Sequence, residues 1–139
     1  MPASDEVMAV VRQWVQKAEN DLTNASFTLK LGKTCPTDTV CFHAQQCVEK
    51  YLKALLVAHG IDFARTHQIA ALRTLLPAAI RPDLSPEEQE LLTDYAVSTR
   101  YPGDYETISL KEARQAVRIA KRVRDQSRTA LTKASYKLL

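Results

Sequence analysis

The chain has 139 residues, of which 45% are hydrophobic and 25% charged, with three Gly, three Cys and a formal net charge of +3. A chain of this length buries about two thirds of its unfolded surface around one core, so we expect one domain over residues 1–139, with its core at about 7–134. Three Gly are too few for folds rich in tight turns or Gly-rich phosphate loops, because those backbone conformations require Gly. The composition therefore favours an all-helical domain.

The sequence carries no sign of export or membrane insertion. No segment has the roughly 18 consecutive apolar residues that a membrane span needs. Residues 1–6 are acidic and lack the basic and apolar parts of a signal peptide. An odd number of Cys suits a reducing compartment better than a disulfide framework. We therefore expect a cytoplasmic protein that does not bind membranes.

Two long helices are predicted in the first half of the chain. Apolar residues at spacings of three and four predict a helix over residues 7–31, which Ser4 can cap and Gly32 can end. A second apolar stripe predicts a helix over residues 39–59. Its opposite side carries four polar residues: Gln46, Glu49, Lys50 and Lys53.

Three more helices are predicted towards the C-terminus. Residues 67–76 support a short helix, and the capping box Ser85-Pro86-Glu87-Glu88 opens a fourth helix over about 86–98. A second capping box at residues 109–112 opens a fifth helix over about 110–134. The chain should therefore fold as an all-α, five-helix, largely antiparallel up-and-down bundle.

The charge is unevenly distributed along the chain. Residues 1–110 hold ten Lys and Arg against fourteen Asp and Glu, whereas residues 111–139 hold nine against two, so the two parts carry −4 and +7. The basic segment is either a helix with a solvated cationic face or a surface that attracts an anionic partner. The sequence leaves both interpretations open.

Motifs for metal or phosphate-loop chemistry are missing from the sequence. The three Gly are too widely spaced for a P-loop or a Gly-x-Gly-x-x-Gly fingerprint, which excludes kinase, Walker-type and Rossmann sites. Cys35, Cys41, His43 and Cys47 do not follow the usual spacing of zinc ligands, and on a helix Cys41 points away from His43 and Cys47. We expect no metal and no cofactor, and cysteines that pack as small apolar side chains.

The most distinctive segment is residues 42–56, Phe-His-Ala-Gln-Gln-Cys-Val-Glu-Lys-Tyr-Leu-Lys-Ala-Leu-Leu. This segment resembles the second helix of the HEPN family, the "higher eukaryotes and prokaryotes nucleotide-binding" domains. Three other segments are similar to the same family: residues 14–29, residues 66–69 and residues 95–105, which include Thr99-Arg100-Tyr101-Pro102. The resemblance therefore covers roughly residues 10–130.

The resemblance implies a five-helix bundle that is usually a homodimer and is often encoded beside a minimal nucleotidyltransferase as a toxin and antitoxin pair. Many HEPN proteins are metal-independent ribonucleases, in which an Arg is followed after four to six residues by a His. That His acts as acid or base on the ribose and leaving oxygen, and the Arg stabilises the phosphate charge. Here Arg100 stands in the place of the Arg, but Tyr105, Glu106 and Thr107 occupy the possible His positions. The usual ribonuclease motif is therefore absent.

A binding site is predicted around the turn after the fourth helix, at Arg100, Tyr101, Asp104 and Tyr105. The Arg can anchor a phosphate while a Tyr stacks on a base. In the HEPN fold this turn lies near the polar side of the second helix, so the resemblance implies that four residues there complete a groove: Gln46, Glu49, Lys50 and Lys53. Alternatively, Arg100 pairs with a neighbouring carboxylate and the tyrosines only pack the turn.

These observations predict a nucleotide- or RNA-binding HEPN protein, in a toxin–antitoxin-type pair with a minimal nucleotidyltransferase. Two alternatives stay open. The protein could be an interaction subunit that docks the nucleotidyltransferase through its basic fifth helix and has no ligand of its own. It could also be a metal-independent ribonuclease with a divergent site that uses Tyr105 or His43.

Overall fold

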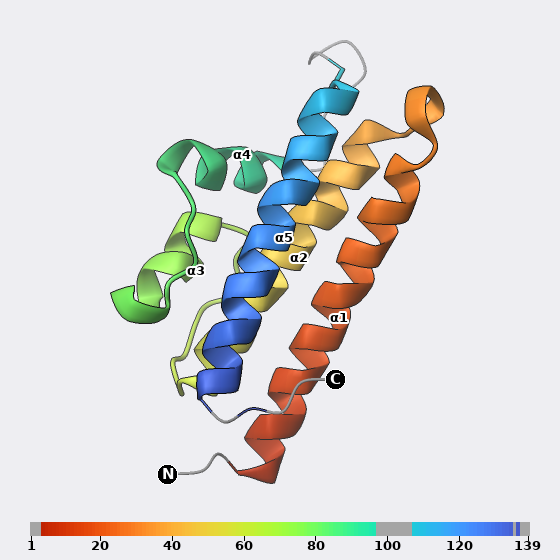
Figure 1. The fold of residues 1–139 in the computed structure, drawn as a ribbon. Coiled ribbons are helices and arrows are strands. Elements are labelled where there is room, and N and C mark those ends of the chain that lie inside the picture. Colours follow the sequence, from red (N-terminus) through yellow and green to blue (C-terminus); the bar gives the residue numbers. More distant parts are fainter. Residues whose placement is uncertain (1–3, 97–106, 135, 137–139) are drawn as a thin grey trace.

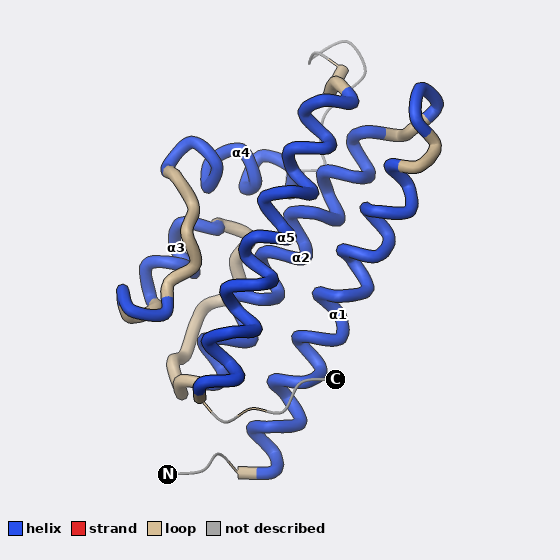
Figure 2. Tube along the Cα trace, viewed as in Figure 1, coloured by secondary structure: helices blue, strands red, loops and turns tan. Residues whose placement is uncertain are grey.

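The computed structural model describes residues 4–96, 107–134 and 136, which form five α-helices and two short 3₁₀ turns without any strand (Figures 1 and 2). The helices are α1 (Asp5–Leu29), α2 (Thr37–Ala58), α3 (Ile69–Leu75), α4 (Pro86–Ala96) and α5 (Leu110–Lys133), and the turns are Gly32–Thr34 and Ala78–Ile80. The predicted all-α, five-helix bundle is confirmed. None of the described helices is long and apolar enough to cross a bilayer.

The three long helices lie side by side, and the shorter α3 and α4 cover one flank of the bundle (Figure 1). The hydroxyl of Thr37, at the start of α2, donates a hydrogen bond to the carbonyl of Ile108, just before α5 (2.7 Å). At the other end the hydroxyl of Tyr136 donates to the carbonyl of Ala58, the last residue of α2 (3.0 Å). Helices α2 and α5 therefore run in the same direction, and α1 runs opposite to both (Figure 1).

The predicted ends of α1 and α4 are formed as their capping residues indicate. The Ser4 side chain accepts a hydrogen bond from the first turn of α1, and Gly32 follows that helix with a φ of 60°, which favours Gly. The capping box of α4 is closed in both directions. The amide of Glu88 donates to Ser85 Oγ (3.1 Å), and the amide of Ser85 donates to the Glu88 carboxylate (2.9 Å).

The capping box of α5 is only half formed. The amide of Glu112 donates to Ser109 Oγ (3.0 Å), but the Glu112 carboxylate accepts from the hydroxyl of Tyr95 at the end of α4 (2.5 Å). Burial and this bond to a carboxylate hold the pKa of Tyr95 above its ordinary value, so the hydroxyl keeps its proton. The bond ties the end of α4 to the start of α5.

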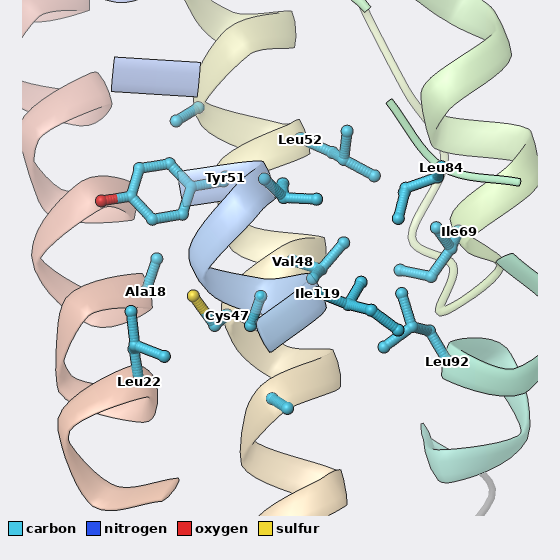
Figure 3. Close-up of a cluster of buried hydrophobic side chains, with 14 of the residues drawn as sticks. Ala18, Leu22, Cys47, Val48, Tyr51, Leu52, Ile69, Leu84, Leu92 and Ile119 are labelled. Atoms are coloured by element: carbon cyan, nitrogen blue, oxygen red, sulfur yellow. The ribbon is translucent and has the colours of Figure 1, made fainter. Parts of the chain in front are cut away.

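Helix α2 supplies the centre of the core. In Figure 3, Cys47 and Tyr51 point towards Ala18 and Leu22 of α1, and on the other side Val48 and Leu52 point towards side chains of the α3 and α4 region. Every residue of the apolar stripe predicted for the second helix is buried: Val40, Ala44, Val48, Tyr51, Leu52, Leu55 and Leu56. Periodicity alone therefore identified the core-facing side of this helix correctly.

All three cysteines are free thiols. Cys41 and Cys47 are fully buried, whereas Cys35 is partly exposed in the turn between α1 and α2. Burial raises the pKa of the Cys41 thiol to about 11 and raises that of Cys47 as well. Both groups are therefore neutral thiols at ordinary pH, which agrees with the packing role expected from the sequence.

Alkylation should report this difference between the cysteines. In the folded protein at about pH 8, iodoacetamide should modify Cys35 alone, because a buried thiol with a raised pKa is almost entirely unreactive. All three should react in denaturant, and mass spectrometry counts the added groups. A Cys35→Ser variant is the control and should stay unlabelled when folded. Rapid labelling of Cys41 in the folded protein would contradict the described packing.

Candidate functional site

One side of α2 carries five polar residues, which together are called the α2 polar face: His43, Gln46, Glu49, Lys50 and Lys53. At about 100° per residue they fall within roughly one third of the helix circumference. Helix α1 borders this face on one side, and the segment between α2 and α3 borders it on the other, as the contacts below show. Gln46 also donates a hydrogen bond to the neighbouring Gln45 (2.7 Å).

Asp21 of α1 organises one half of the α2 polar face. Although only 8% of Asp21 is exposed, both of its carboxylate oxygens are used. One contacts Nδ1 of His43 (2.8 Å), and the other accepts from Nζ of Lys50 (2.6 Å). Because a carboxylate accepts, Nδ1 is the donor, and Nε2 is the acceptor of the neutral ring. Nε2 has no hydrogen-bond partner among the residues that the structure describes.

Glu49 organises the other half and is only 3% exposed. Its carboxylate accepts from Nζ of Lys53 (3.0 Å) and from Gln45 (2.9 Å), and it contacts Nδ1 of His67 just before α3 (2.8 Å). The Lys53 ammonium also lies 5.4 Å from the ring centroid of Trp14, a cation–π distance. Lys53 is therefore held between a carboxylate and an aromatic ring.

Glu49 and Lys53, four residues apart on α2, form an ion pair that is buried and does not lie on a solvated face. The sequence shows that this side of α2 is polar, yet it does not show that α1 and the segment before α3 cover it. Since Lys50 pairs with Asp21 and Lys53 pairs with Glu49, the two lysines add little net positive potential at the surface. His43, Gln46 and Lys50 are the half-buried members that a ligand could reach.

The loop residues of the predicted site, Arg100, Tyr101, Asp104 and Tyr105, lie outside the described residues, as does the alternative pairing of Arg100 with a neighbouring carboxylate. The two flanks of residues 97–106 are described. The end of α4 is bonded to the start of α5 through Tyr95, and the residue two before α5, Ile108, is bonded to the first residue of α2. Both flanks therefore lie at the end of the bundle where α2 and α5 begin.

The basic residues of α5 fall into two groups. Arg122 pairs with Glu88 of α4 (2.6 Å), and Arg124 and Arg128 pair with Glu19 of α1 (2.9 and 3.0 Å). Lys133, the last residue of the helix, is exposed and has no ion-pair partner among the described residues. The same holds for four residues earlier in the helix: Lys111, Arg114, Arg118 and Lys121. We call these four the α5 basic stripe. The surplus charge of residues 111–139 is thus partly used to join helices and partly left at the surface.

Sequence reasoning did not assign a role to Asp21 or to His67 in the polar network. A signal was available for Asp21, because it is a charged residue on the apolar side of α1, next to Leu22. Such a residue on a buried face needs a partner. No comparable signal marked His67, whose contact with Glu49 depends on how the chain returns to α3. Among the described residues no group of three or more His, Cys, Asp or Glu is placed to hold a metal ion.

The model of the HEPN domain matches residues 11–129. The chain belongs to the HEPN domain family. It is 33% identical over 99 residues to a Methanocaldococcus jannaschii protein named "Putative toxin MJ1304", a match that covers 66% of this chain and 63% of that protein. The family resemblance drawn from residues 42–56 is therefore confirmed.

Two solved structures share this HEPN fold over most of their length. TT1696 from Thermus thermophilus has a TM-score of 0.70 and 29% identity, with 86% of this chain and 96% of that chain covered. ST0689, described as an archaeal HEPN homologue, has a TM-score of 0.69 and 28% identity, with 87% and 97% covered. Both structures match nearly from end to end, which supports the arrangement of helices described above.

Removing one charge from the buried half of the α2 polar face should destabilise the fold. Glu49→Ala leaves the Lys53 ammonium buried without its carboxylate, so the free energy of unfolding should fall by about 3 kcal/mol. Urea denaturation followed by circular dichroism measures the change.

The matched control removes both charges and keeps the volume. The double variant Glu49→Leu, Lys53→Met should recover most of the lost stability, because an apolar pair replaces a buried ion pair at little cost. If Glu49→Ala loses less than about 1 kcal/mol, the pair is not buried as described.

Proposed function

We propose that this HEPN protein is the nucleotide- or RNA-binding component of a toxin–antitoxin-type pair, with a minimal nucleotidyltransferase as its partner and without the usual ribonuclease motif. Family membership and the name of the Methanocaldococcus jannaschii relative support a toxin-like role. The nucleotidyltransferase partner, a cytoplasmic location and a homodimeric state are taken from the resemblance and the composition, and they are part of the proposal.

The observation that carries the proposal is the α2 polar face. Buried ion pairs add little stability compared with apolar side chains of the same volume, so stability alone is a weak reason for such a face on a central helix. The flanks of residues 97–106 lie at the end of the bundle where α2 begins, and we propose that the segment between them reaches the half-buried members of this face. A ligand site formed jointly by residues 97–106 and the α2 polar face fits this arrangement.

In this site Arg100 anchors a phosphate and Tyr101 or Tyr105 stacks on a base, while Asp104 accepts hydrogen bonds. The α2 polar face contributes differently from a simple positive field. Gln46 and the already paired Lys50 offer hydrogen bonds, and Glu49 and Lys53 hold the face in place. Phosphate recognition must come from side chains, since the sequence has no Gly-rich loop.

Substitution of Arg100 should show whether this residue binds a ligand phosphate or has no role in ligand binding. Arg100→Ala should weaken binding of ATP by roughly tenfold to a hundredfold, because a charged hydrogen bond to phosphate contributes about 1.5–3 kcal/mol. Lys133→Ala, an exposed residue at the far end of α5, is the control and should bind like the wild type. Fluorescence anisotropy at two salt concentrations measures the affinities. Equal affinity in the Arg100 variant and the wild type would contradict the proposal.

A metal-independent ribonuclease is the second candidate function, and the Asp21–His43 contact favours it. A carboxylate on Nδ1 orients an imidazole and fixes its tautomer, as in other acid–base sites. Nε2 of His43 could accept the proton of a ribose 2′-OH while the 2′-oxygen attacks phosphorus. The bond to the 5′-oxygen then breaks, that oxygen takes a proton from a second acid such as Tyr105, and a 2′,3′-cyclic phosphate forms.

RNA cleavage assays test this second function. If the wild type cleaves RNA, His43→Ala and Asp21→Asn should each lower the rate about a hundredfold or more. His67→Ala is the matched control, because His67 also contacts a buried carboxylate but has no role in this step. Cleavage that persists in a His43→Ala, Tyr105→Phe double variant would exclude both catalysts.

A further inference from the structure

The α5 basic stripe presents four cations along one line. Lys111, Arg114, Arg118 and Lys121 follow one another at intervals of three or four residues, so their side chains lie on the same side of the helix. At 1.5 Å per residue the stripe is about 15 Å long. None of the four shares in the ion pairs that join α5 to α1 and α4 within the described part of the chain. Their charge is therefore available to an external partner.

A groove between α1 and α5 lies beside this stripe. It has a volume of about 390 Å³, and Lys121 of the stripe forms part of its wall, together with Phe27 and Lys30 from the end of α1. The Phe27 side chain is unusual for an aromatic residue, because it is 64% exposed. The Lys30 ammonium lies 4.4 Å from the centroid of the Phe27 ring. An exposed aromatic ring thus lies beside the Lys30 ammonium at the side of the stripe. The groove is also lined by Glu19 and Asp125, whose carboxylates are both paired with Arg124.

These features favour one class of partner. Protein interfaces are built around an apolar core that is depleted of charged residues, whereas the four members of the stripe are all charged. Single-stranded nucleic acids are bound in the opposite way, by a cationic track for the phosphates and aromatic side chains on which bases stack. We propose that the groove between α1 and α5 binds a single-stranded polynucleotide, with its phosphates along the α5 basic stripe and a base on Phe27. This proposal adds a second surface to the proposed function and does not involve Arg100.

The first test uses the salt dependence of binding to a uridine oligomer of about 12 nucleotides. Each phosphate contact of a single strand contributes about −0.7 to the slope of log affinity against log salt. The variant Arg114→Gln, Arg118→Gln should therefore have a slope less negative by about 1.4 and should bind about 25-fold more weakly at about 0.1 M salt. Lys17→Gln, Lys133→Gln is the control, because it removes the same charge from exposed positions outside the stripe. This control should keep the wild-type slope.

The second test addresses stacking on Phe27. Phe27→Ala should weaken binding of the uridine oligomer about tenfold, because one stacked base is lost. It should leave binding of a duplex of equal length unchanged, since paired bases cannot stack on a side chain. Leu31→Ala is the matched control: Leu31 is also an exposed apolar residue near the end of α1, but it does not line the groove. A thymidine oligomer shows whether RNA or single-stranded DNA is preferred.

Two results would overturn the proposal. One is an equal loss of affinity in the charge control and the stripe variant. The other is equal competition by oligoglutamate of the same charge, which would assign the stripe to an acidic protein. The tests are independent of the α2 site. If the stripe variant weakens oligomer binding while Arg100→Ala leaves ATP binding intact, the proposed function fails and the groove stands. If instead Arg100→Ala weakens ATP binding while the stripe variant binds the oligomer like the wild type, only the proposal of the groove between α1 and α5 fails.

Discussion

The burial of α2 among the other four α-helices is the constraint on which the rest of the structure depends. Little of its surface is left for water, so its charged side chains need partners inside the protein. Asp21 on α1 neutralises Lys50, and Glu49 neutralises Lys53. An uncompensated charge at such positions costs several kcal/mol. The approach of α1 and of the segment before α3 is therefore linked to the formation of these pairs.

This constraint divides the charges of the molecule into an inner and an outer set. The inner set, on α2, consists of paired charges and is close to neutral. It can offer hydrogen bonds and an oriented imidazole to a ligand, but it adds little electrostatic potential at the surface. The outer set, on α5, joins helices through Arg122, Arg124 and Arg128 and leaves the α5 basic stripe without ion pairs to the described residues. The two sets suit different tasks. Local recognition suits α2, and attraction of a long anionic chain suits α5.

Local signals in the sequence predicted the helices, whereas the side-chain contacts between different helices could not be predicted. Ser4 and the Ser85–Glu88 box act within a few residues of the chain, and both caps form as expected. Glu112 fits its local motif equally well, yet its carboxylate bonds to Tyr95 on another helix. For the same reason the polar side of α2 was found from periodicity, but its burial and the role of Asp21 were not. Those features depend on which helices pack against α2.

Two-dimensional NMR of the protein during titration with a uridine oligomer tests most directly whether side chains on these surfaces bind nucleic acid. Amide signals should shift at residues 111–121 and around Phe27, and at the start of α2, while α3 and the last turns of α5 stay unchanged. Shifts confined to α3, or no shifts at concentrations well above those needed for an ordinary single-strand binder, would contradict nucleic-acid recognition by this HEPN bundle.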